Sequence, residues 1–130
     1  MNPSNYLKIK NKIPSNVNIL AVSKGFKSQE IKIINNIGQN DFGESKVQEA
    51  LEKQLILKDI HEIKWHFIGR IQSNKIRKIV QNFKYIHSVD SFAKLQKISN
   101  ISAEEKKNPL LLLQVKLSDD PTKGGFNPDF

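Results

Sequence analysis

Short apolar segments alternate along the chain with segments in which apolar residues recur every three or four positions. The former are predicted strands and the latter amphipathic helices. The strand candidates are Ile19–Ser23, Asp41–Phe42, Lys64–Ile68, Lys84–His87 and Leu110–Val115. They begin 20 to 26 residues apart. Because parallel strands need a crossover connection, this alternation predicts parallel βα units.

A helix is expected between each pair of strands. The predicted N-terminal caps are Ser28, a capping box of Ser45 and Gln48, Ser73, and Asp90 or Ser91. The apolar stripes expected to face the core are Ile31 and Ile34; Val47, Leu51 and Leu55; Ile76, Ile79, Val80 and Phe83; and Phe92, Leu95 and Ile98. The last strand is apolar without alternation, which predicts cover on both of its faces.

A length of 130 residues with 38% hydrophobic residues is typical of one soluble domain, predicted to span residues 1–130. Two architectures fit: an open doubly wound sheet and a (β/α) barrel. A complete barrel has eight strands and about 250 residues. Asn127 and Pro128 predict a helix that begins as the sequence stops, which indicates a fragment. Five strands of a barrel would leave two unpaired edges, so such a piece should associate, whereas a full-length chain should be a monomer.

The formal net charge of +8 raises the possibility of a nucleic-acid partner. Lysine supplies 19 of the 21 basic residues and arginine only Arg70 and Arg77, whereas reading phosphates and bases favours arginine. The charge therefore indicates a solvated surface and no nucleic-acid partner. A basic nucleic-acid-binding domain remains an alternative, with a steep loss of affinity in salt as its expected signature.

Several other classes of protein and site are disfavoured. No apolar stretch approaches the roughly 20 residues of a membrane helix, and the first residues do not resemble a signal peptide. We therefore expect a cytoplasmic protein without a membrane partner. Cysteine is absent, and His61, His66 and His87 lack metal-ligand spacing, so no metal site is predicted.

Polar residues follow the predicted strands, where parallel α/β folds carry their chemistry. Lys24 directly follows the first strand. Desolvation beside apolar walls would disfavour its ammonium form and leave an amine able to form a Schiff base with a carbonyl, including the aldehyde of pyridoxal phosphate. The alternative is a lysine that only extends to water.

Five segments carry a family resemblance: "AVSKGF", "DFGESKVQEAL", "WHFIGRIQSNK", "IHSVDS" and "LLQVKLSDDPTKGGF". In this order and spacing they resemble the pyridoxal phosphate homeostasis protein family, from about Ile19 to Phe126. Members of that family are similar to the N-terminal domain of alanine racemase, a TIM-type barrel. The resemblance implies that this chain is the N-terminal five βα units of such a parallel (β/α) barrel.

The resemblance also implies a set of cofactor-binding residues, with Lys24 as the covalent attachment point. The further residues are Glu44, Ser45, His66 and Ser88. Ser45 stands where the family usually has Asn, so a shorter hydroxyl replaces an amide. His66 has the alternative role of a hydrogen-bonded core histidine, and the two serines could be caps or strand-end hydrogen-bonding residues. No catalytic residue is assigned.

The function implied is a carrier that holds pyridoxal phosphate as a reversible Schiff base on Lys24 and releases it, with pyridoxal phosphate-dependent apo-enzymes as possible recipients. The alternative is a racemase-like enzyme. Alanine racemases pair the lysine with a tyrosine, and neither Tyr6 nor Tyr85 lies in a matching motif. The phosphate-binding loops of such barrels follow the seventh and eighth strands. We therefore expect weaker cofactor retention by this chain than by a full-length relative.

Overall fold

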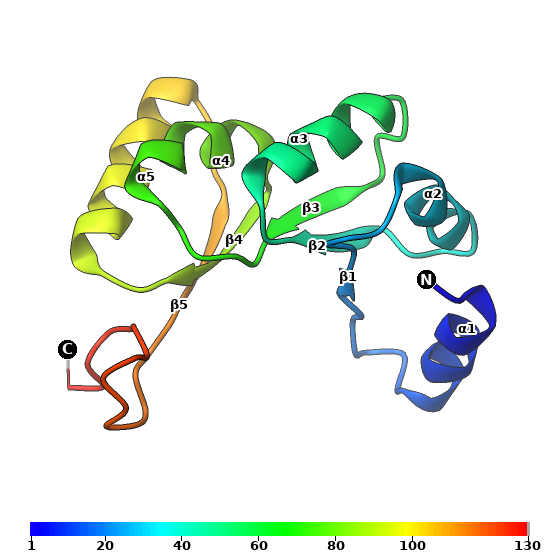
Figure 1. Ribbon diagram of the computed structural model, residues 1–130, viewed down its shortest axis with the longest axis horizontal. Coiled ribbons are helices and arrows are strands. Elements are labelled where there is room, and N and C mark those ends of the chain that lie inside the picture. The colour runs from blue at the N-terminus through cyan, green and yellow to red at the C-terminus, as the bar shows by residue number, and fades with distance from the viewer. Residues whose placement is uncertain (130) are drawn as a thin grey trace. The chain divides into compact units, whose positions relative to one another are not determined.

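The computed structural model describes residues 1–129, in two compact units, Met1–Lys64 and the segment from Trp65 onward. Within residues 1–129, five strands alternate with helices (Figure 1). The strand pairings within each unit are parallel. The predicted parallel α/β class is confirmed. The interpretation of residues 1–130 as a single domain stays a prediction.

The first unit has three helices and two paired strands. In chain order they are α1 (Pro3–Lys12), β1 (Ala21–Val22), α2 (Ser28–Asn36), β2 (Asp41–Glu44) and α3 (Val47–Ile56). In the parallel pair, Ala21 lies opposite Phe42 and Val22 opposite Gly43. The apolar core of this unit consists of Ile31, Ile34, Phe42, Ala50, Leu57 and Ile63.

Helix α1 was not predicted, although the chain begins with an ordinary start signal. The Asn2 side chain accepts a hydrogen bond from the Asn5 N–H at 3.2 Å, and Pro3 occupies the first helical position. Two predicted caps are wrong. Lys27 precedes α2 and Lys46 precedes α3, so Ser28 and Ser45 with Gln48 do not cap these helices.

The buried face of α3 differs from the predicted stripe of Val47, Leu51 and Leu55. The helix buries Ala50 and Lys53, whereas Leu55 is exposed. The prediction failed because it counted only apolar residues. Lys53, whose hydrogen-bond partners lie in the interior, occupies a buried position of α3 in place of an apolar residue.

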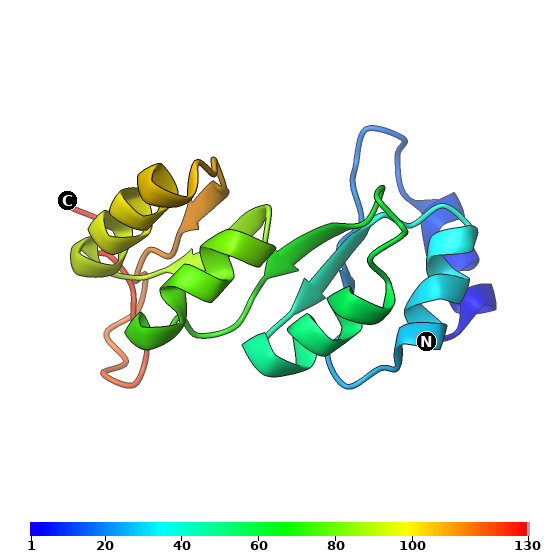
Figure 2. The same cartoon turned by 90° about the horizontal axis from the view of Figure 1, so that it is seen from above.

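As far as residue 129, the second unit contains three strands and two α-helices, and the first residue of β3, Lys64, is the last residue of the first unit. Its elements are β3 (Lys64–Phe67), the 3₁₀ turn η1 (Ser73–Lys75), α4 (Ile76–Asn82), β4 (Tyr85–Val89), α5 (Phe92–Glu105) and β5 (Leu110–Leu113). Strand β4 pairs in parallel with both β3 and β5. Helices α4 and α5 pack side by side (Figures 1 and 2). The largest fully buried side chains here are Phe67, Ile71, Ile76, Ile79, Val80, Ile86, Val89 and Ile98.

Local sequence signals performed better in this unit. The Ser91 hydroxyl caps α5 by accepting from the Lys94 N–H at 3.3 Å, and the predicted stripe of α4 is buried. Ser73 lies in the 3₁₀ turn, and its predicted cap of α4 is wrong because Lys75 precedes that helix. Phe92, which was expected in the core, is exposed, while Ile98 is buried as expected.

The expectation of a β5 strand covered on both faces is wrong. Leu110 is 54% exposed and Leu112 is 48% exposed. Beyond β5, Val115 forms an isolated parallel bridge with Phe126. The helix expected at the end of the chain is described only as a turn, in which the Asp129 N–H donates to the Asn127 side chain at 3.0 Å.

Candidate functional site

Lys24 lies on a tight turn at the carboxyl end of β1. The Phe26 N–H donates to the Ser23 carbonyl at 3.0 Å and closes the turn, and Gly25 has a φ of 79°. A positive φ at the third position of the turn is typical of a type II turn and favours glycine. Lys24 occupies the second position with an exposed side chain. The apolar walls that the desolvation argument required are therefore not found around it.

Glu44, at the end of β2, is the centre of a buried polar cluster beneath this turn. Its side chain is 0% exposed and accepts hydrogen bonds from the Ser23 hydroxyl and from the Lys53 ammonium, the latter at 3.0 Å. Lys53 is itself 6% exposed. The Ser23 N–H also donates to the Gly43 carbonyl at 2.9 Å, so the strand pairing continues up to the turn.

Glu49 joins the cluster at its solvent side. Its Oε1 accepts from the Lys53 ammonium at 2.9 Å and from the Gly25 N–H at 2.7 Å. The hydrogen bond from Lys53, followed by that from Gly25, lowers the pKa of Glu49 below its ordinary value. The carboxylate is therefore ionised at neutral pH.

Ser45 lies half-buried between β2 and α3, next to Glu44. The structure thus places three of the predicted residues in the first unit: Lys24 on the turn, Glu44 directly under it through Ser23, and Ser45 beside Glu44. Their roles as cofactor contacts stay predictions.

His66 and His87 face each other on neighbouring strands of the second unit. His66 Nδ1 and His87 Nε2 are 3.0 Å apart, and the His66 ring stacks on Tyr85 with centroids 4.1 Å apart. His66 is buried, which agrees with the alternative of a hydrogen-bonded core histidine. The pKa of His87 is lowered first by burial, which disfavours the charged imidazolium, and then by the electrostatic effect of the neighbouring His66.

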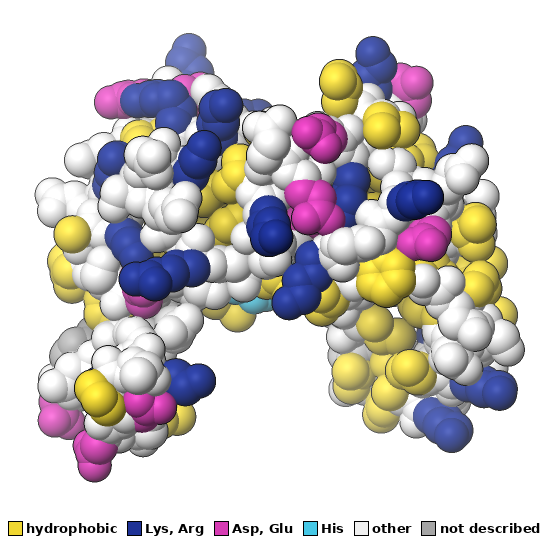
Figure 3. All heavy atoms as spheres, viewed as in Figure 1, with side chains coloured by type: hydrophobic (Ala, Val, Ile, Leu, Met, Phe, Trp, Pro, Cys, Tyr) yellow, Lys and Arg dark blue, Asp and Glu magenta, His cyan; other side chains and the backbone are white. Residues whose placement is uncertain are grey.

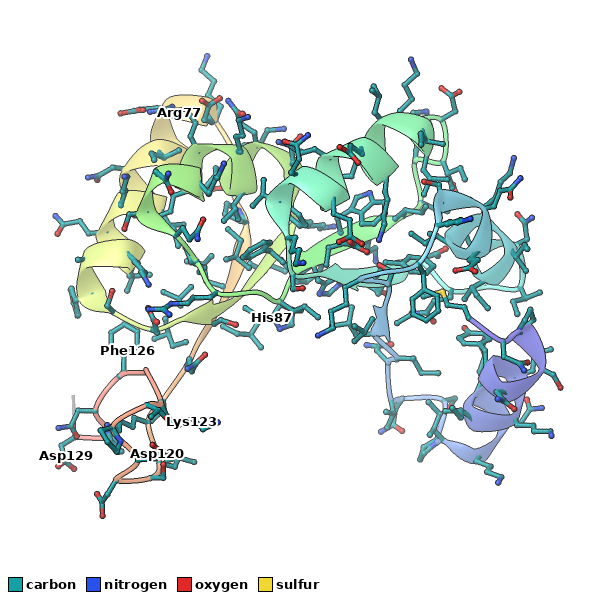
Figure 4. The ribbon with its side chains drawn as sticks, viewed as in Figure 1. Arg77, His87, Asp120, Lys123, Phe126 and Asp129 are labelled. Carbon is teal, nitrogen blue, oxygen red and sulfur yellow. The ribbon has the colours of Figure 1, made fainter. Side chains whose placement is uncertain are left out.

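Ser88 borders a cavity of about 380 Å³ at the carboxyl ends of β3, β4 and β5. Its φ of 65° is unusual for a residue with a Cβ atom. Arg70, Asp90 and Lys123 also line this cavity, which makes it polar. Figure 4 labels His87 on β4 and Lys123 in the loop after β5.

Sequence reasoning missed Lys53 and Glu49. A signal was present, because the two are four residues apart, the spacing of a helical ion pair, and Lys53 continues a stripe with Ala50 and Leu57. A lysine at such a position is normally assigned to the surface. Only the hydrogen bonds of Lys53 to Ser23 and Glu44 show that this side chain belongs to the interior.

Two negative findings apply to residues 1–129. No helix among them combines the length and apolar character needed to cross a membrane. No group of three or more histidine or acidic side chains in this range could hold a metal ion. Figure 3 shows lysine and arginine side chains scattered among acidic ones on the face in view.

Comparisons with known proteins identify the family. The family model described as the alanine racemase N-terminal domain matches residues 3–129. The pyridoxal phosphate homeostasis protein of Synechocystis is 46% identical over 124 residues, which cover 95% of this chain. The chain belongs to the pyridoxal phosphate homeostasis protein family. The protein of the same name in Pseudomonas aeruginosa is 40% identical over 89% of the chain.

Solved structures of this family have the same fold. PipY of Synechococcus elongatus without PLP matches with a TM-score of 0.93 at 41% identity, and the form described with PLP bound matches with 0.91 at 39%. Each match covers 98% of this chain. An alanine racemase of Clostridium difficile, at 17% identity, shares the fold with a TM-score of 0.78. The predicted resemblance of the fold to the N-terminal barrel domain of alanine racemase is thereby confirmed.

The chain spans about half the length of the curated relatives that it matches. The matched segments cover 57% of the Synechocystis protein and 50% of the Pseudomonas protein. The matched segments cover 59% and 58% of the two PipY chains.

Proposed function

We propose that this chain binds pyridoxal phosphate through a Schiff base on Lys24 and serves in pyridoxal phosphate homeostasis. The observation that carries the proposal is the exposed lysine on a hydrogen-bonded turn at the carboxyl end of a parallel strand. Membership of the family and the description of one PipY structure as PLP-bound support it.

The residues of the turn suit the aldehyde of this cofactor. When bound, the cofactor would supply an aldehyde, and the Lys24 amine would hold it as a reversible Schiff base. Because the Lys24 side chain is exposed, a soluble aldehyde can approach it. The turn itself is fixed by the bond between Phe26 and Ser23. Glu44, Ser45, His66 and Ser88 are proposed as further contacts to the cofactor.

We propose a carrier instead of an enzyme. The relatives are named as homeostasis proteins. A carrier needs only the amine and a reversible bond. Recipient apo-enzymes, a cytoplasmic location and a monomeric full-length form belong to the same proposal.

The test is borohydride reduction in the presence of pyridoxal phosphate, followed by mass measurement and peptide mapping. The adduct is expected on Lys24 and absent from that position in Lys24→Ala. Lys27→Ala is the matched control, because Lys27 is an exposed lysine of the same segment and contacts Glu30 through its backbone N–H and carbonyl. Equal labelling of Lys24 and the other lysines would refute the proposal.

A second assay separates carrier from enzyme. D- and L-alanine are incubated with the loaded protein, and racemisation is followed by chiral chromatography. We expect no turnover above that of free pyridoxal phosphate. Turnover that disappears in Lys24→Ala would instead establish a racemase-like enzyme.

A further inference from the structure

We propose that Lys53 and Glu49 are positioning residues that hold the turn carrying Lys24, an inference that rests on the proposed function of Lys24. The two side chains are one helical turn apart on the same face of α3. Each contacts a different peptide group, one just before Lys24 and one just after it. The helix therefore acts on the reactive residue through its backbone and leaves its side chain exposed.

The contact before Lys24 is made by the Ser23 carbonyl. This oxygen accepts from the Phe26 N–H at 3.0 Å and from the Lys53 ammonium at 2.8 Å. Ser23 is 0% exposed, so water does not compete readily for the site. The orientation of the peptide that joins Ser23 to Lys24 is consequently tied to α3.

The contact after Lys24 is made by the Gly25 N–H, which donates to Glu49 Oε1 at 2.7 Å. This N–H belongs to the central peptide of the turn. The orientation of that peptide distinguishes a type II turn from a type I turn. A carboxylate that accepts from the Gly25 N–H thus favours one of the two orientations of the peptide that follows Lys24 and limits the motion of the backbone that carries it.

Glu44 makes the buried position of Lys53 possible. An unpaired ammonium would be strongly unfavourable in the interior, and Glu44 neutralises it through both carboxylate oxygens at 3.0 Å. Lys53 thereby directs its donors to Ser23, Glu44 and Glu49. An apolar pair of similar volume could stabilise the fold equally well. A role in orienting the turn explains why charged groups occupy these positions.

Positioning matters because the amine must approach a carbonyl carbon from a defined direction. Misplacement of a reacting group by about 1 Å can cost about 100-fold in rate. The experiment therefore measures how strongly Lys24 is preferred over the other lysines of the same chain. Limiting pyridoxal phosphate is added, the adducts are trapped with borohydride, and the labelled peptides are quantified.

Three single variants of α3 are compared with wild type. Glu49→Ala removes the acceptor of the Gly25 N–H and should lower the preference for Lys24 between about 10- and 100-fold. Glu49→Gln keeps an oxygen at that position and should restore most of the preference. Glu52→Ala removes a glutamate on the exposed side of the same helix and should leave it unchanged. The measured quantity is the labelling of Lys24 relative to the other lysines of the same folded chain. A loss of stability alone should therefore not change it.

A charge-neutral double variant, Glu44→Gln/Lys53→Met, removes the contact between Lys53 and the Ser23 carbonyl without leaving a buried charge. It should also reduce the preference for Lys24. Glu44→Gln alone is its control, because Glu44 is also a proposed cofactor contact. Amide hydrogen exchange at Gly25 reports on the turn without any cofactor, and it should be faster in Glu49→Ala than in wild type or Glu52→Ala.

The outcomes separate the two proposals. If wild type labels Lys24 preferentially and both Glu49→Ala and the double variant do so equally, the positioning role is overturned and the proposed function stands. Unchanged exchange at Gly25 in Glu49→Ala would also overturn it. If wild type shows no preference for Lys24, the proposed function fails, and the positioning role fails with it.

Discussion

Removing the Lys53 ammonium should destabilise the chain far more than removing the whole buried ion pair. In Lys53→Met, the Glu44 carboxylate keeps its 0% exposure and loses the ammonium bonded to both of its oxygens. Breaking a buried pair in this way typically costs about 3–5 kcal/mol. That is a large part of the roughly 5–15 kcal/mol that stabilises a typical native protein.

The double variant Glu44→Gln/Lys53→Met should lose much less, about 0–2 kcal/mol, because no charge is left in the interior. The amide oxygen of glutamine can still accept from the Ser23 hydroxyl, and the Ser23 carbonyl keeps the Phe26 N–H. The difference between the single and the double variant is therefore expected to exceed about 1 kcal/mol.

Urea unfolding followed by circular dichroism measures these free energies of unfolding. Arg77→Met is the control, because Arg77 pairs with Glu104 and Glu105 at the surface, where solvent screening leaves an ion pair only a small effect on stability. A cost for Lys53→Met no larger than that of Arg77→Met would refute the reasoning. So would a double variant that is less stable than Lys53→Met.

Three further predictions concern pH and association. Because the pKa of Glu49 is lowered in the folded state, its stabilising contribution is present above the ordinary value of 4.5 and lost as the pH falls towards the folded-state pKa. Acid unfolding of Glu49→Gln should lack this part of the pH dependence that wild type shows. His87 should titrate below 6.5 in an NMR experiment, and His66→Phe should raise that pKa by removing the electrostatic effect of His66, although burial still lowers it. A His87 pKa unmoved in His66→Phe would contradict the assignment of the second cause. The exposed leucines of β5 should make the chain self-associate at high concentration, and Leu112→Glu should reduce that association in sedimentation velocity; identical profiles would contradict it.

The sequence by itself determined the features that depend on neighbours along the chain. The alternation of strands and helices follows from local hydrophobic periodicity, which backbone geometry converts directly into secondary structure. The cap at Ser91 and the buried stripe of α4 were predicted correctly for the same reason. The position of Lys24 at the end of a strand was likewise visible, because a polar residue that terminates an apolar run marks that end.

Only the tertiary structure decided the environment of each side chain. Lys53 has the sequence context of a surface residue, and its burial depends on Ser23 and Glu44, which lie 30 and 9 residues away in the chain. The exposure of Lys24 and of the β5 leucines depends on what packs beside them. Composition and periodicity contain no such information, because burial and hydrogen bonding of this kind are properties of contacts between distant segments.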